Sequence, residues 1–189
     1  MENPLDRIED TFEVNLPVPE DNSLEGYLDT TLRDLRQFSE DLRETEYFVS
    51  PGGKPWLEIT DDPNVQESIL HFFNEGGEYL LSVEGNVTKG KWRLLDGSNK
   101  LIIEKGQHLS ELYELAFLNQ YFFVLRKHGS HRKKGKYLFL GYEPVANKLR
   151  WRDAVDMMYD TYRGKQTTFS YLVIFVVLIA AIAAAFSYC

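Results

Sequence analysis

The sequence predicts a mainly β domain, an antiparallel up-and-down meander that forms a small barrel or a strongly bent sheet. It is flanked by an N-terminal helix and by a C-terminal helix that leads into one transmembrane helix. Three observations support this prediction. Short aromatic and β-branched runs alternate with turn sequences in the middle of the chain, helical periodicity brackets that region, and the last 21 of the 189 residues carry no charge. The predicted parts are an acidic disordered arm (1–22), an amphipathic helix (23–46), the β domain (55–145), a juxtamembrane helix (148–163) and the transmembrane helix (169–186).

The first helix is predicted from an N-cap and an apolar stripe. Ser23 is a typical N-cap residue, and the apolar residues that follow it recur at spacings of three and four as far as Leu42. Asp29 and Arg33 are placed for an i,i+4 ion pair on the opposite face. We expect the stripe to pack on the β domain, and a separate partner-binding helix is the alternative.

Seven or eight strands are predicted next, and most of the candidate segments end at a turn sequence. Their spacing of about 8–12 residues is typical of hairpin-linked strands in small all-β domains, and closure of the sheet would hide its edges. The candidates are Trp56–Ile59, Ile69–Phe73, Tyr79–Val83, Lys91–Leu95, Leu101–Glu104, Glu111–Leu118, Tyr121–Lys127 and Lys136–Tyr142.

Bulky aromatic residues are the predicted interior of the β domain. Trp92, on a strand between two glycine turns, is the strongest single candidate. A barrel of about eight strands is either just filled by side chains or holds one small ligand, and this much aromatic volume favours a filled core. The predicted core or ligand-lining residues are Phe72, Tyr79, Trp92, Tyr113, Phe123 and Phe139.

Several of these segments resemble the bacterial lipocalin-like domains. The resemblance lies in a glycine turn before an aromatic residue (Phe73–Tyr79), a G-x-W strand (Gly90–Leu94), and short strands that end in alternating apolar residues (Asn99–Ile103, Tyr113–Leu115 and Phe123–Leu125). It covers roughly residues 56–142. It implies a meandering β-barrel or half-barrel with a tryptophan-anchored core.

The C-terminal segment Phe169–Phe186 contains one polar residue, Ser170, and no charge. Eighteen helical residues span roughly 27 Å, close to the hydrocarbon thickness of a bilayer. Five basic residues precede the segment and no charged residue follows it, so the positive-inside rule places the N-terminal domain in the cytoplasm. We therefore expect a single-pass, tail-anchored membrane protein. Cys189 falls near the far membrane surface.

The sequence contains none of the common catalytic motifs. We find no nucleophile elbow, HExxH motif, P-loop or dinucleotide-binding glycine loop. His128 and His131 lie in a strongly basic loop where a metal ion would be repelled. We therefore expect no enzymatic activity, no cofactor and no metal site.

Charge is distributed unevenly. Residues 1–62 have a net charge of −12, and residues 121–168 have a net charge of +7 next to the predicted span. Anionic cytoplasmic lipids attract such basic residues, so the loop 129–135 either contacts headgroups or is a solvated hairpin. The candidate anionic-lipid contacts are Arg132, Lys133, Lys134, Lys136, Arg163 and Lys165. The overall charge of −8 disfavours nucleic-acid binding.

Two functions are consistent with this pattern. The first is a non-enzymatic scaffold or interaction subunit at the membrane, whose acidic arm and helix recruit a protein partner. The second is a lipocalin-like binder of a small apolar or lipid ligand at the membrane surface. The packing of the barrel interior distinguishes the two.

Overall fold

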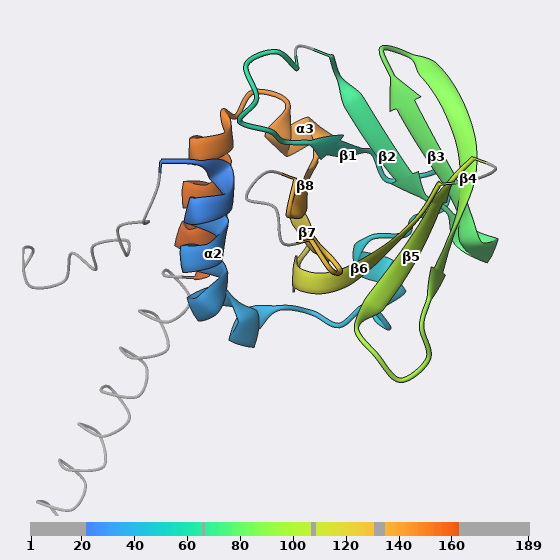
Figure 1. Ribbon diagram of the computed structural model, residues 1–189, viewed down its shortest axis with the longest axis horizontal. Coiled ribbons are helices and arrows are strands. Elements are labelled where there is room, and N and C mark those ends of the chain that lie inside the picture. The colour runs from blue at the N-terminus through green and yellow to red at the C-terminus, as the bar shows by residue number, and fades with distance from the viewer. Residues whose placement is uncertain (1–21, 66, 107–108, 131–134, 163–189) are drawn as a thin grey trace, which may run out of the picture.

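The computed structural model describes residues 22–65, 67–106, 109–130 and 135–162. They form a closed barrel of eight antiparallel strands in sequence order, with helices on one side (Figure 1). The predicted mainly β meander is confirmed, and of its two predicted forms the structure has the barrel. The strands are β1 (Trp56–Glu58), β2 (Ile69–Phe73), β3 (Glu78–Val83), β4 (Asn86–Leu94), β5 (Lys100–Lys105), β6 (Leu109–Leu118), β7 (Phe122–Lys127) and β8 (Tyr137–Tyr142).

The barrel closes where its first and last strands meet. β1 pairs antiparallel with β8, with Trp56 opposite Tyr142 and Glu58 opposite Leu140. This closure leaves neither strand with a free edge, which is the usual way for a small sheet to avoid pairing with other chains.

Two local features set the register. β4 begins at Asn86, five residues earlier than predicted, because Glu84 and Gly85 form the whole hairpin turn; both have positive φ, 51° and 82°, as a two-residue type I′ turn requires. In β6 a bulge between Leu115 and Phe117 shifts the alternation by one residue. Phe117 therefore faces outward and Leu118 faces the interior.

The barrel interior is one hydrophobic core. Its rings contact one another across the barrel: Phe123 on β7 lies 5.5 Å from Phe73 on β2 and 5.7 Å from Trp56 on β1, between centroids. The buried interior residues are Leu42, Phe48, Trp56, Phe73, Tyr79, Leu101, Ile103, Tyr113, Leu118, Phe123, Leu125, Leu138 and Leu140. This packing agrees with the predicted filled core.

A segment outside the strands closes one end of the interior. Residues 39–50 follow the first helix, and both Leu42 and Phe48 are fully buried in the interior. The Phe48 ring lies 5.4 Å from the ring of Trp92, and its carbonyl accepts a 3.1 Å hydrogen bond from Trp56 Nε1.

A second hydrophobic core lies outside the barrel. Helix α2 (Leu24–Leu35) and the helical residues 151–162 lie side by side against the outward faces of β6, β7 and β8 (Figure 1). A short helix, α3 (Glu143–Ala146), follows β8. The predicted packing of the first helix on the β domain is therefore the arrangement seen. The core residues on the strands are Phe117, Phe122, Val124 and Phe139, and those on the helices include Leu28, Leu32, Val155 and Met158.

The first helix is shorter than predicted. It ends at Leu35 and continues only as a 3-10 turn, η1 (Arg36–Phe38), and a second such turn, η2 (Thr45–Tyr47), follows later. Two hydrogen bonds hold the extended chain beyond η1 against the end of β6: the Glu40 backbone N–H donates to Leu118 O at 3.0 Å, and the Ser39 side-chain Oγ accepts from Leu118 N at 3.0 Å. Leu42, predicted on the helix stripe, enters the barrel instead. Tertiary contacts thus override the local periodicity.

The acidic arm before residue 22 and the predicted span 169–186 lie outside the described residues. Within the part of the chain that the structure describes, no helix combines the length and the apolar character needed to cross a membrane.

Candidate functional site

The structure places the predicted core residues in four different environments. Tyr79, Tyr113 and Phe123 lie in the barrel interior, as expected. Phe139 is buried, but on the outward face of β8 under the helices. Phe72 faces outward on β2, because the inward positions of that strand are His71 and Phe73. Trp92 packs at the border of the interior and is only half-buried.

A polar chain occupies the interior at one point. The fully buried His71 on β2 bonds to two neighbours: its Nε2 lies 2.9 Å from Glu58 Oε2 on β1, and its Nδ1 lies 2.7 Å from the Tyr79 hydroxyl on β3. Burial lowers the pKa of His71 despite the carboxylate beside it. In the neutral imidazole, Nε2–H donates to Glu58 and Nδ1 accepts from the Tyr79 O–H.

A second polar group adjoins the first. Glu111 on β6 accepts a 2.8 Å hydrogen bond from the Tyr113 hydroxyl and pairs with Lys105 at 3.1 Å and with Lys127. Burial acts to raise the pKa of Glu111, but the hydrogen bonds from Lys127 and Tyr113 and the charge of Lys105 lower it to about 2. The charges of Lys105 and Glu111 also act on the pKa of Glu58. Each buried polar atom in these two groups therefore has a partner, which removes the main cost of burying it.

Glu58, His71 and Tyr79 are hydrogen-bonded in the same order as the residues of a catalytic triad, but the imidazole and the hydroxyl are not accessible to solvent. A carboxylate orients an imidazole, which in turn faces a hydroxyl. Burial raises the pKa of the Tyr79 hydroxyl, and its side chain is 1% exposed beside a fully buried His71. No substrate can contact either group in this conformation, so the cluster acts as a structural part of the core.

The accessible candidate site is a groove on the outer wall of the barrel. It has a volume of about 410 Å³ and lies between the first helix and β5 to β8. Below it is called the wall groove. Its lining residues are Asp29, Leu32, Arg33, Arg36, Asn99, Lys100, Glu114, Leu115, Ala116, Arg126 and Tyr137.

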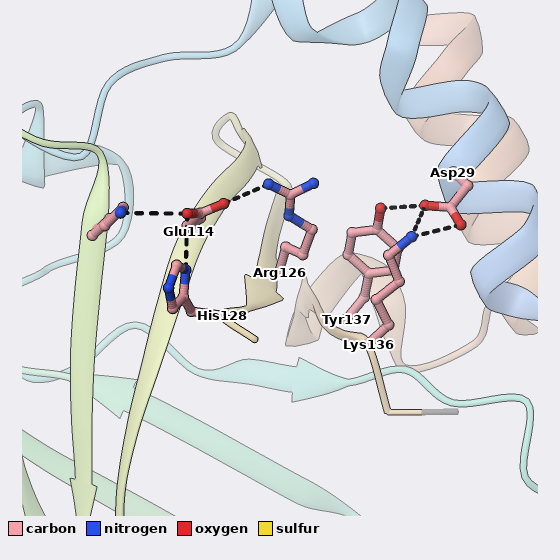
Figure 2. A network of polar contacts seen from close by, with 7 residues as sticks. Asp29, Glu114, Arg126, His128, Lys136 and Tyr137 are labelled. Atoms are coloured by element: carbon pink, nitrogen blue, oxygen red, sulfur yellow. Dashed lines mark hydrogen bonds and ion pairs between the residues drawn. The ribbon is translucent and has the colours of Figure 1, made fainter. Parts of the chain in front are cut away.

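Glu114 is the carboxylate on the barrel side of the wall groove. Figure 2 shows it between Arg126 and His128, whose nitrogen atoms lie 2.5 Å and 3.0 Å from its oxygens; Lys100 Nζ lies at 3.5 Å. The hydrogen bond from Arg126, supported by those from His128 and Lys100, lowers the pKa of Glu114 to about 2. One negative charge is therefore shared among three basic side chains.

Asp29 is the carboxylate on the helix side. It accepts hydrogen bonds from Lys136 Nζ at 2.5 and 2.8 Å and from the Tyr137 hydroxyl at 2.5 Å (Figure 2). Tyr137 is the first residue of β8, and Lys136 directly precedes it. The predicted Asp29–Arg33 pair within the helix does not form. Asp29 instead connects α2 to the barrel.

Two arginines of the wall groove have no counter-ion among the residues that the structure describes. Arg33 and Arg36 are exposed, and neither forms an ion pair or side-chain hydrogen bond with any residue in the described ranges. The lining contains four basic residues (Arg33, Arg36, Lys100 and Arg126) and two carboxylates. The wall groove therefore has an excess of positive charge.

Of the predicted lipid-contact residues, the structure describes only Lys136. Its ammonium group is paired with Asp29 and its side chain is 27% exposed, so it serves the helix–barrel contact in this conformation. Arg132, Lys133, Lys134, Arg163 and Lys165 lie outside the described residues, and their lipid contacts stay a prediction.

Sequence reasoning missed the two arginines and His71. The arginines could have been found from the helix periodicity, because positions 29, 33 and 36 share one face. His71 is inward by strand alternation with Phe73, but nothing in the sequence indicates its partner Glu58, which is 13 residues away on another strand. Among the described residues, no group of three or more His, Cys, Asp or Glu side chains is arranged to hold a metal ion.

Comparison with known proteins gives no match: no family model, no curated protein and no solved structure is significantly similar to the chain. The site must therefore be interpreted from its own chemistry.

Proposed function

We propose that the chain is a membrane-anchored, non-enzymatic interaction protein, which presents its β domain in the cytoplasm and binds its partner on the outer surface of the barrel. The observation that carries the proposal is the contrast between inside and outside. The interior is packed with aromatic rings and closed at one end by residues 39–50, whereas the wall groove is open and charged.

The helix pair supports an interaction role. α2 and the helical residues 151–162 bring both ends of the domain to the same side of the barrel, with Tyr27 and Trp151 in edge contact at 5.3 Å between ring centroids. The predicted span starts seven residues beyond Tyr162. A ligand bound in the wall groove would thus contact α2, which packs against the helical residues that precede the proposed anchor.

The alternative function is a lipocalin-like binder that holds a small apolar or lipid molecule inside the barrel. The eight-stranded antiparallel barrel is compatible with it. The packing of the interior favours the interaction role over this alternative. Phe48 contacts Phe73, Trp92 and Phe123 at ring distances of 5.9, 5.4 and 5.1 Å, and so occupies the volume that an interior ligand would need. An interior ligand would first have to displace this segment.

Purification of the full chain tests the proposal. The chain is solubilised in mild detergent, and retained proteins and lipids are identified by mass spectrometry. We expect a protein partner in a fixed ratio to the chain. Retention of a single apolar small molecule without any protein would contradict the proposal and favour the lipocalin-like alternative.

A further inference from the structure

We propose that the wall groove binds a phosphate-bearing ligand through Arg33, Arg36 and Arg126. The inference rests on the proposed function, since it names the chemistry that this outer surface recognises. Three features of the groove support it: arginines with no ion pair among the described residues, the contribution of arginines from different elements, and its charge balance and size.

The first feature is the loss of the expected counter-ion of Arg33. A carboxylate four residues earlier normally satisfies such an arginine on an isolated helix. Here Lys136 and Tyr137 occupy both oxygens of Asp29. Arg33 is left facing an open cavity, and Arg36, one turn further, has no carboxylate partner among the described residues either.

The second feature is that arginines from different elements line the same groove. Arg33 and Arg36 come from the helix side, and Arg126 comes from β7. Arg126 is fixed by one hydrogen bond to Glu114, which leaves most of its N–H donors available. One guanidinium group, with its two parallel N–H donors, satisfies a carboxylate. A phosphate monoester has three terminal oxygens and up to two negative charges, so it can accept hydrogen bonds from several guanidinium groups at once.

The third feature is the balance of charge and space. Two carboxylates face four basic groups, so an incoming dianion would neutralise the lining. A volume of about 410 Å³ accommodates a phosphate with a sugar or glycerol moiety attached. The same chemistry is found in a soluble phosphate ester and in a phospholipid headgroup, and the test below separates the two.

The test uses the full chain with isotope-labelled arginine in dodecyl maltoside micelles. Inorganic phosphate is the first probe, with chloride at matched ionic strength as the control for screening. We expect saturable shifts of the Nε–Hε resonances of Arg33, Arg36 and Arg126. Shifts of equal size with chloride would overturn the inference.

A matched pair of double variants tests the site. Arg33→Gln/Arg36→Gln removes the two unpaired arginines of the groove. Arg93→Gln/Arg150→Gln removes the same charge from two exposed arginines elsewhere, whose side chains are 60% and 88% exposed. We expect the first variant to bind phosphate about tenfold more weakly or worse, and the second to bind it like the wild type. If both variants lost phosphate affinity equally, the effect would come from net charge alone and the inference would be wrong.

Nanodiscs distinguish the sources of the phosphate. The full chain is placed in discs of phosphatidylcholine, with or without phosphatidic acid. Shifts of the same three resonances that depend on phosphatidic acid identify a lipid headgroup, and shifts with soluble phosphate alone identify a soluble ester; both support the inference.

The acidic arm of the chain itself is the competing occupant. If deletion of residues 1–21 shifts the three resonances without phosphate, the arm fills the groove and the inference is wrong.

The phosphate-binding experiment and the partner purification test different claims. If a protein partner is captured but phosphate does not bind, only the inference about the wall groove is wrong. If phosphate binds but no protein partner is captured, only the proposed interaction role is wrong.

Discussion

At the scale of single residues, the interior depends on Trp56 more than on Trp92. Trp56 is fully buried, bonds to Phe48 O, and has Lys54 Nζ 4.3 Å from its ring centroid. Trp92 also uses its indole N–H, donating to Asn74 O at 2.9 Å, but it is only half-buried. The glycine turns that flank Trp92 indicate a strand and say nothing about burial, so the sequence could not show that Trp56 is the more deeply buried of the two tryptophans.

This difference gives the first prediction. Trp56→Ala should lower the free energy of unfolding by about 3–5 kcal/mol, and Trp92→Ala by roughly half as much, because the loss scales with the buried volume removed. Urea denaturation of the two variants beside the wild type measures both effects. An equal or larger loss for Trp92→Ala would mean that the interior is centred on β4.

The second prediction concerns His71 and pH. Burial holds the pKa of His71 below its ordinary value of 6.5, so the folded protein keeps the ring neutral at a pH where the unfolded chain binds a proton. The free energy of unfolding is therefore unaffected by His71 above pH 6.5. Below that pH it falls, by up to about 1.4 kcal/mol per pH unit, because the unfolded chain binds a proton that the folded protein does not.

Denaturation curves from about pH 7.5 to about pH 5.5 measure this slope. His71→Gln removes the titrating group and should flatten the curve, although the variant is less stable throughout. The other histidines are present in both proteins and cancel in the comparison. Parallel curves for wild type and variant would show that His71 is not the responsible group.

At the scale of elements, the position of α2 is set by apolar burial more than by its polar network. Leu28 on α2 is fully buried in the hydrophobic core that α2 forms with the helical residues 151–162 and the outer face of the barrel. Asp29, beside it, makes three short hydrogen bonds to β8, but its side chain is 46% exposed, and exposed ion pairs contribute little net stability.

We therefore expect Leu28→Ala to lower the free energy of unfolding by about 2–4 kcal/mol and Asp29→Asn by less than about 1 kcal/mol. Both substitutions are one residue apart on the same helix, so differences in helix propensity are small. Thermal unfolding of the two variants distinguishes the effects. A larger loss of stability for Asp29→Asn would show that the hydrogen bonds of Asp29, and not the hydrophobic core outside the barrel, hold the helix in place.

The sequence was most informative about strands and least informative about how the helix ends. All eight strands were expected from alternation and turn residues, because those signals are local. The end of α2 at Leu35 depends on hydrogen bonds between Leu118 and residues 39 and 40, about 80 residues away, and on burial of Leu42 inside the barrel. The wall groove likewise depends on Asp29 bonding to β8, more than 100 residues later, so periodicity alone could not show which charges remain unpaired.

At the scale of the whole molecule, contacts between the two ends of the chain complete the domain. The barrel closes only when β1 pairs with β8, and α2 packs only where the helical residues 151–162 lie beside it. Tyr162, the last described residue, is 7% exposed; its hydroxyl accepts a 3.0 Å hydrogen bond from Asn119 Nδ2, and its ring stacks on Phe38 at 5.3 Å. The folded unit therefore extends at least to Tyr162, close to the start of the predicted anchor.

Two truncations test the anchor and this boundary together. Removal of residues 165–189 deletes the predicted span but keeps every described residue, and we expect a folded protein that stays in solution after a high-salt wash of the membranes. Removal of residues 156–189 also deletes Met158 and Tyr162 from the outer core, at a cost of several kcal/mol, comparable with the whole stability of a small domain. We expect this second protein to be unfolded or to aggregate, as measured by circular dichroism and size-exclusion chromatography. If the first truncated protein still sediments with membranes, residues 169–186 are not the anchor. If the second is as stable as the first, the helical residues 151–162 do not belong to the folded unit.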